Sequence, residues 1–229
     1  MDRPKFNLLT SVLLGAVLLA GSCVDSHAQE VVDKTVAVVG EGRQAALITY
    51  SDLLWQLALQ PGVPLAEPRS EDLNQALQLL INQRLFAIEA ARLPRTAPSE
   101  KEIADKISAT LAFFPNPAAF ETRLKQVGFD SIQDEAFQRL MAERVAIEKY
   151  IDFRFASFVV VTGDEEQRHY REVFVPEFLR TSRGRIVPTL EESRASIRST
   201  LTREKVATAI ERFLDDAKRR VQVEILIEV

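Results

Sequence analysis

The sequence has little of the residue types on which most catalysis depends. It contains one cysteine, Cys23, and two histidines, His27 and His169, among 229 residues. Cys23 and His27 both lie in the first 28 residues, which have the features of a cleavable leader. Its removal would leave one histidine and no cysteine, so thiol chemistry is excluded from the rest of the chain and a metal site would have only carboxylates beside one histidine.

The first 28 residues contain the parts of a secretory signal peptide in the usual order. Basic residues come first, an apolar run at 8–20 follows, and small residues precede Ala28 and Gln29, where we predict cleavage. The run is shorter than the roughly 20 residues of a membrane helix. No later stretch is as apolar, so we expect no transmembrane segment in the mature chain, 29–229.

A second processing site is present in the same leader. The segment Leu19–Cys23 resembles a bacterial lipobox, although Ala20 stands where leucine is usual. Processing there would leave a lipid on Cys23, whereas cleavage after Ala28 would discard this residue. Both routes remain open from the sequence.

Charge and motif content exclude several function classes. The net charge is −4, and short basic clusters such as Lys218–Arg220 suit a helix C-terminus better than a nucleic-acid surface. Phosphate-binding glycine loops and dinucleotide motifs are absent from the sequence. We therefore expect no cofactor, no metal and no nucleic-acid partner.

The remaining candidates for catalysis are isolated. His169 lies in a strongly charged stretch, 165–172, that is typical of a solvated helix face, and a lone histidine needs an orienting partner to act as an acid or base. The acidic pairs Glu191-Glu192 and Asp215-Asp216 are adjacent in sequence, so they point in different directions on a helix. We predict no catalytic residues and no enzyme activity.

Periodicity predicts strands at both ends of the mature chain and helices between them. Segments 31–39 and 45–49 are β-rich around a glycine turn, and the alternating segment 221–229 is a third strand. Ser51-Asp52 is expected to cap the first helix. Later helix starts are expected at Ser70, at the capping box beginning with Ser99, at Pro117, near Asp130–Gln133, and at the capping boxes beginning with Thr162 and Thr189.

These elements predict a mainly α-helical domain of about six helices with a small β-sheet. The terminal strands need partners, so we expect the last strand to pair with the first. We predict a signal peptide at 1–28 and a single domain at 29–229. Its core helices would span 51–160, and the C-terminal helix and strand, 189–229, would pack back on the first strand. Exchange of these strands between two copies is also possible in principle.

The order of several short motifs resembles the SurA-type periplasmic chaperones (the SurA N-terminal domain family). The similar segments are Gln29–Val39 with Ile48–Leu53, Leu80–Leu85 with Glu89-Ala90, Pro98–Ile103, Phe120–Gln133, Thr162–Tyr170 and Val187–Val229. One part of the family pattern is missing. Residues 175–186 stand where members insert parvulin prolyl isomerase domains, which use histidines and commonly a cysteine. Prolyl isomerase activity is therefore disfavoured.

The resemblance implies a periplasmic, ATP-independent holdase for unfolded or partly folded proteins, chiefly outer-membrane β-barrels. The absence of nucleotide motifs agrees with a compartment that lacks ATP. An alternative from another class is a dedicated envelope assembly partner that binds one specific protein, and loss of the isomerase domain fits it equally well. Prolyl isomerase is the enzyme alternative.

Phenylalanine is the remaining unusual feature, because ten of the 13 lie between Phe113 and Phe178. Core packing is the ordinary explanation. The spacing of Phe153, Phe155 and Phe158 does not fit one helical stripe, which favours an apolar cleft partly open to solvent. The predicted peptide-binding residues are Phe113, Phe114, Phe120, Phe129, Phe137, Tyr150, Phe153, Phe155 and Phe158.

Overall fold

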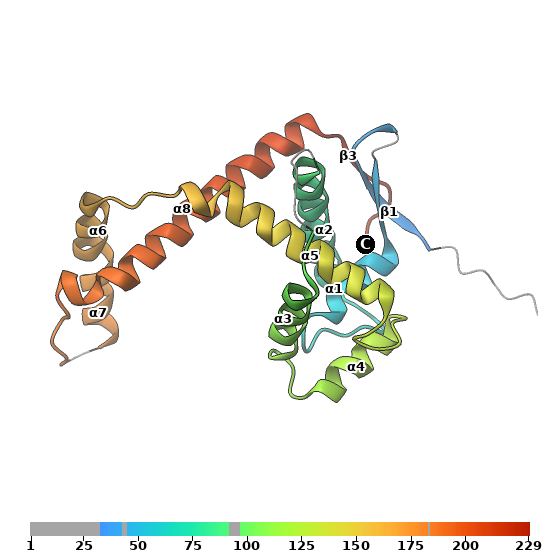
Figure 1. The fold of residues 1–229 in the computed structure, drawn as a ribbon, viewed down its shortest axis with the longest axis horizontal. Coiled ribbons are helices and arrows are strands. Elements are labelled where there is room, and N and C mark those ends of the chain that lie inside the picture. Colours follow the sequence, from blue (N-terminus) through green and yellow to red (C-terminus); the bar gives the residue numbers. More distant parts are fainter. Residues whose placement is uncertain (1–32, 43–44, 92–96, 183) are drawn as a thin grey trace, which may run out of the picture. The chain divides into compact units, whose positions relative to one another are not determined.

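Three strands form one antiparallel sheet that brings the first and last strands of the described chain side by side (Figure 1). The computed structural model describes residues 33–42, 45–91, 97–182 and 184–229. Strand β1 (Thr35–Val39) lies between β2 (Ala46–Thr49) and β3 (Val223–Ile225). The mainly helical fold with a small sheet, and the pairing of the terminal strands, are confirmed.

Several predictions fall outside the described residues. These are the signal peptide at 1–28, cleavage between Ala28 and Gln29, and lipidation of Cys23.

Strand β3 is shorter than the predicted strand 221–229. It begins later because Val221 caps the preceding helix. Within the strand Ala37 lies opposite Ile225, and the Leu226 amide donates a hydrogen bond of 2.8 Å to the Val36 carbonyl just beyond it. The C-terminal strand is thus tied to β1 by backbone hydrogen bonds.

The helices that follow β2 begin at or near the predicted positions. They are α1 (Tyr50–Ala58), α2 (Ser70–Ala90), α3 (Glu100–Leu111), α4 (Pro117–Gln126) and α5 (Glu135–Arg154). Ser99 caps α3 and Pro117 occupies the first turn of α4, as predicted. Two starts differ from prediction: Thr49 rather than Ser51 caps α1, through a capping box with Asp52, and Asp134 caps α5.

A second helical stretch precedes the C-terminal helix. It consists of α6 (Gly163–His169), a π-helical turn at Tyr170–Phe174 and α7 (Val175–Thr181), and it includes residues for which the sequence predicted no element. The wide turn has a local cause. Pro176 has no amide to donate to the carbonyl four residues earlier, and its ring would clash with that carbonyl. Helix α8 (Leu190–Arg220) then starts at the predicted capping residue Thr189.

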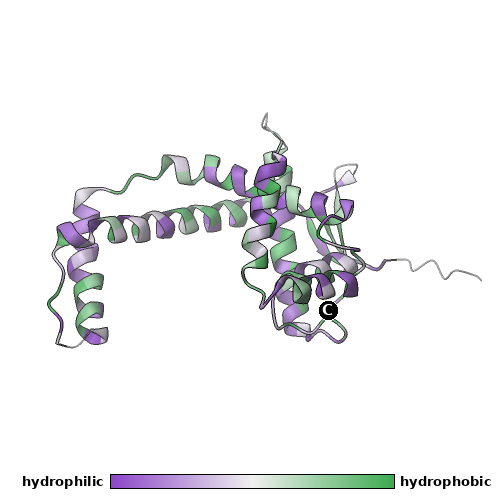
Figure 2. Ribbon diagram, turned by 60° about the horizontal axis from the view of Figure 1, so that its bottom comes forward, coloured by the Kyte–Doolittle hydropathy of each residue, from purple (hydrophilic) through white to green (hydrophobic). Residues whose placement is uncertain are grey.

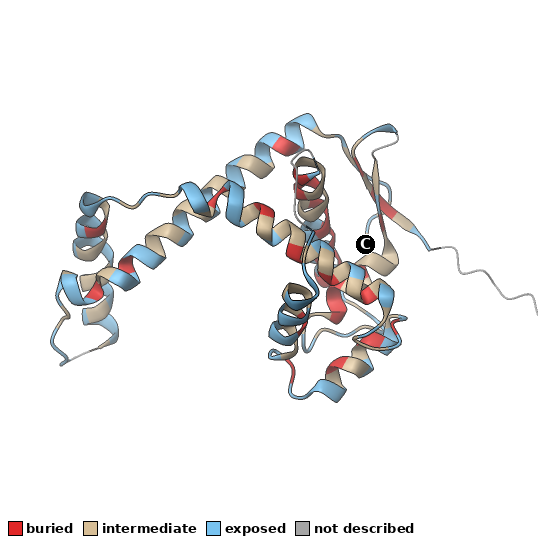
Figure 3. Ribbon diagram, viewed as in Figure 1, coloured by how far each residue is buried: buried red, intermediate tan, exposed pale blue. Residues whose placement is uncertain are grey.

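Buried side chains form three clusters. The first joins the sheet to α1, α2 and the end of α8; the second joins α3, α4 and α5 to Trp55; the third joins α2, α5 and α8. Phe213 of α8 packs against both the first and the third cluster. Figure 3 shows that buried residues are frequent in α1 and α2 and scarce in α6 and α7.

Along α8, apolar residues recur at helical spacing among charged ones (Figure 2). Ile197 is buried near the start of the helix, whereas Val206, Ile210 and Phe213 pack into the third cluster. One amphipathic helix therefore contacts α6 near its start and the body of the protein near its end.

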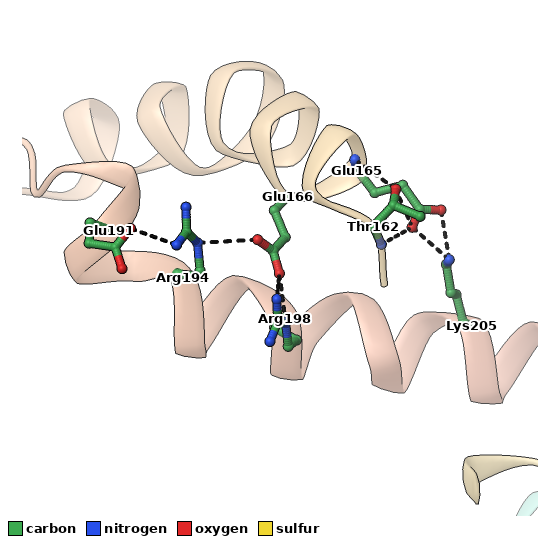
Figure 4. A network of polar contacts seen from close by, with 7 residues as sticks. All are labelled: Thr162, Glu165, Glu166, Glu191, Arg194, Arg198 and Lys205. Carbon is green, nitrogen blue, oxygen red and sulfur yellow. Dashed lines mark hydrogen bonds and ion pairs between the residues drawn. The ribbon is translucent and has the colours of Figure 1, made fainter. Parts of the chain in front are cut away.

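Polar contacts join α6 to the N-terminal half of α8 (Figure 4). The Glu166 carboxylate is 3% exposed and lies 2.6 Å from the Arg198 guanidinium and 3.3 Å from that of Arg194. Glu165 accepts a hydrogen bond from the Thr162 amide at 2.8 Å and pairs with Lys205 at 2.6 Å. Loss of either arginine would leave this buried carboxylate less compensated and would destabilise the contact.

The contact between α6 and α8 should weaken in acid. Hydrogen bonds from Lys205 and from the Thr162 amide lower the pKa of Glu165 from 4.5 to about 2. Because the folded-state pKa is depressed, this stabilisation is complete above about pH 4.5 and is lost as the pH falls toward 2. We expect Glu165→Gln to lower the thermal unfolding midpoint at pH 7 and to flatten its decline between pH 4.5 and pH 2. An unchanged decline in the variant would contradict this assignment.

Candidate functional site

An open cleft lies between the end of α5 and the C-terminal half of α8. Its volume is about 830 Å³. The 3₁₀ turn Ala156–Phe158 forms one side of it and Glu89 of α2 contributes at one end. We call it the aromatic cleft; its lining residues are Glu89, Tyr150, Arg154, Phe155, Phe158, Val159, Ala209, Arg212, Phe213, Asp216, Arg219 and Arg220.

At the end of α5, neighbouring aromatic side chains lie in different environments, some buried and some exposed to solvent. The helix stops at Arg154 and the chain continues as a 3₁₀ turn. Phe155, at the junction, is 7% exposed, whereas Phe153 and Phe158 on either side are 59% and 70% exposed. The spacing that did not fit one helical stripe therefore marks a helix end, where one ring points inward and two point outward.

The floor of the aromatic cleft is a packed aromatic cluster. The Phe155 and Phe213 rings lie 5.5 Å apart at 68°, and the Tyr150 ring lies 6.4 Å from each of them. Phe86 of α2 stacks on Phe213 at 5.1 Å. Such edge-on and stacked contacts add stability beyond area burial, so the floor is preformed.

Exposed apolar groups lie beside this floor. The Phe158 ring lies 6.4 Å from that of Phe153 at 77°, an edge-on pair open to solvent. The Arg154 guanidinium lies 5.6 Å from the centre of the Phe155 ring, within the range of a cation–π contact. The site therefore combines exposed aromatic rings with the positive charge of Arg154.

The hydroxyl of Tyr150 adds a polar group at the cleft. Burial and the nearby Glu89 carboxylate raise its pKa, and the positive charge of Arg154 opposes them. The hydroxyl therefore stays protonated at neutral pH and can donate a hydrogen bond to a bound chain.

The charged residues of the aromatic cleft are mostly arginines. Arg220 lies 3.8 Å from Glu89, and Arg219 pairs with Asp216. Arg154 and Arg212 are exposed and form no ion pair within the described part of the chain. The cleft therefore has an excess of positive charge, although the chain as a whole is net −4.

The structure does not bring the nine predicted peptide-binding residues together. Four of them are buried in the second core cluster: Phe114, Phe120, Phe129 and Phe137. Tyr150, Phe155 and Phe158 line the aromatic cleft, and Phe153 contacts Phe158. Phe113 is 73% exposed but does not line the cleft.

Sequence reasoning missed the α8 side of the site. Ala209, Phe213, Asp216 and Arg220 recur at helical spacing and line the aromatic cleft from one face of α8. That pattern was visible in the sequence. In the sequence, the basic residues at the end of this helix are explained by the helix dipole, and no local pattern connects them with Phe155.

The acidic pairs take part in helix capping and ion pairs, and His169 lies at the end of a helix. Glu192 accepts a hydrogen bond from the Thr189 amide in the capping box of α8, Glu191 pairs with Arg194, and Asp216 pairs with Arg219. His169 is the last residue of α6 and does not line the aromatic cleft. In the described segments no group of three or more candidate ligands could hold a metal ion.

A second cavity of about 580 Å³ lies between α2 and α5. Its Arg84 lies 3.8 Å from Asp52 and 3.3 Å from Glu143. Its other arginine, Arg144, donates to the buried Gln56 side chain, and burial lowers the pKa of Arg144 to about 10. This cavity has internally balanced charges, unlike the aromatic cleft.

No protein-family model matches the sequence, and no curated protein matches it. In the part of the chain that the structure describes, none of the helices has the length and apolar character needed to cross a membrane.

Burial divides the predicted phenylalanines into two groups with different roles. Phe137→Ala should lower the free energy of unfolding by about 3–5 kcal/mol, because a fully buried ring is replaced by a cavity. Phe113→Ala should change it by less than about 0.5 kcal/mol, since the ring is exposed. Urea unfolding followed by circular dichroism measures both values. Equal effects would contradict the assignment of Phe137 to the core.

Proposed function

We propose that the protein is a non-catalytic, ATP-independent periplasmic chaperone that holds unfolded polypeptides in the aromatic cleft. The main support is the cleft itself. A preformed aromatic floor lies beside exposed phenylalanines in an open groove, and exposed apolar surface of this kind marks binding sites for other chains.

The size of the exposed apolar surface suits reversible binding. Burial of one phenylalanine-sized side chain contributes about 1.5–3 kcal/mol, whereas a dissociation constant of 1 µM requires about 8 kcal/mol. A client must therefore place several residues in and around the cleft. Short segments would exchange rapidly, which is what a holdase needs in order to release its client.

The resemblance to SurA-type chaperones supports the same function and suggests the clients. It places outer-membrane β-barrel proteins, before they fold, among the expected partners. The residues that stand in place of a parvulin domain, 175–186, include the short helix α7 and contain no histidine. The proposal therefore attributes activity to binding alone.

The proposed activity predicts suppression of aggregation. The purified protein should slow aggregation of a denatured outer-membrane β-barrel at a near-equimolar ratio, measured by light scattering on dilution from urea. Phe158→Asp should reduce this suppression severalfold, because it places a carboxylate on the apolar side of the aromatic cleft. The ring is largely exposed, so folding should be retained.

Phe113→Asp is the matched control for this experiment. Phe113 has nearly the same exposure as Phe158, 73% against 70%, but does not line the cleft. We expect its variant to behave like the wild type. Absence of suppression by the wild type, or equal loss in the two variants, would contradict the proposal.

A further inference from the structure

We infer that the aromatic cleft selects segments in which a large apolar side chain has carboxylates as near neighbours. This inference deepens the proposed function, on which it rests, and names the chemistry of the preferred client. The cleft has four arginines and two carboxylates among its lining residues.

The two carboxylates are already engaged. Glu89 lies 3.8 Å from Arg220, and Asp216 pairs with Arg219. Arg154 on the α5 side and Arg212 on the α8 side have no acidic partner within the described residues. An apolar residue bound over Phe155 and Phe158 would thus have an uncompensated guanidinium on each side of the cleft.

Positive charge continues past one end of the cleft. Arg219 and Arg220 also line a neighbouring hollow of about 460 Å³, together with Lys218 and Glu41. The end of α8 therefore presents a run of basic side chains from one hollow to the next. A longer acidic segment would remain beside positive charge as it left the aromatic cleft.

Arginine is well suited to this recognition. Its planar guanidinium donates paired hydrogen bonds to a carboxylate. Side chains of an extended peptide alternate between two faces, so a carboxylate two residues from a bound aromatic side chain lies on the same face, toward the arginines of the α5 wall and the α8 wall. Lysines at the same peptide positions would meet like charge, which costs binding free energy.

The test compares dye-labelled peptides that are identical except beside a central phenylalanine pair, where they have glutamate, glutamine or lysine. Fluorescence anisotropy with the wild-type protein at neutral pH should give the tightest binding for the glutamate peptide, roughly tenfold tighter than for the lysine peptide. The preference should shrink in 0.5 M salt, because screening of exposed charges shortens to a few ångström near that ionic strength.

Arg212→Glu should weaken binding of the glutamate peptide severalfold and strengthen binding of the lysine peptide. Arg203→Glu is the matched control: Arg203 is an exposed arginine of the same helix that donates a hydrogen bond to Thr200 and does not line the cleft. Its variant should retain the wild-type preference.

The outcomes separate this inference from the proposed function. Equal affinity for the three peptides, with loss of binding in Phe158→Asp, would overturn the acidic preference and leave the cleft as a general apolar site. Equal effects of Arg212→Glu and Arg203→Glu would also overturn the preference. Failure of every peptide to bind, together with wild-type chaperone activity in Phe158→Asp, would overturn both.

Discussion

Antiparallel pairing of β1 with β3 determines where α8 lies, and the rest of the structure depends on that placement. Strand β3 follows α8 after a two-residue connection, so hydrogen bonds to β1 fix the end of the helix beside the sheet. Ala217 is then buried in the first cluster and Phe213 stacks on Phe86. Without this pairing the end of α8 would lose its connection to the sheet, and side-chain packing alone would hold this wall of the aromatic cleft.

The two halves of α8 are held by different physical interactions. The C-terminal half packs through aromatic rings against α2 and α5, where burial of apolar area contributes most of the stability. The N-terminal half contacts α6 largely through ion pairs around Glu166 and Glu165. Apolar packing tolerates salt and acid better than ion pairs do. The aromatic cleft therefore adjoins the apolar contact of α8, which is less sensitive to salt and acid than the ion-paired contact with α6.

Much of the fold could be predicted because local signals agreed with the tertiary structure. Capping residues Ser99, Thr162 and Thr189 begin helices where the sequence indicated. Pairing of the terminal strands followed from the need to satisfy their backbone groups. The wide turn at Tyr170–Phe174 was not predicted, because a proline such as Pro176 within a helical stretch can equally kink or end the helix.

The site was predicted only in part, for a physical reason. A phenylalanine has the same local signal in a core as in a cleft, and only the packing of distant helices distinguishes them. Tyr150, Phe155 and Phe158 were identified with the cleft, but Phe120 and Phe137 belong to the core. Phe213 and the α8 arginines could be placed opposite α5 only once the strand pairing had positioned the helix.

Site-specific photo-crosslinking tests the central claim most directly. A photoreactive amino acid is placed at position 158, or at position 113, and the protein is illuminated with an unfolded outer-membrane β-barrel. The account predicts a client adduct from position 158 and little from position 113, because only the first lies at the aromatic cleft. Adducts of equal yield from both positions, or from position 113 alone, would contradict it.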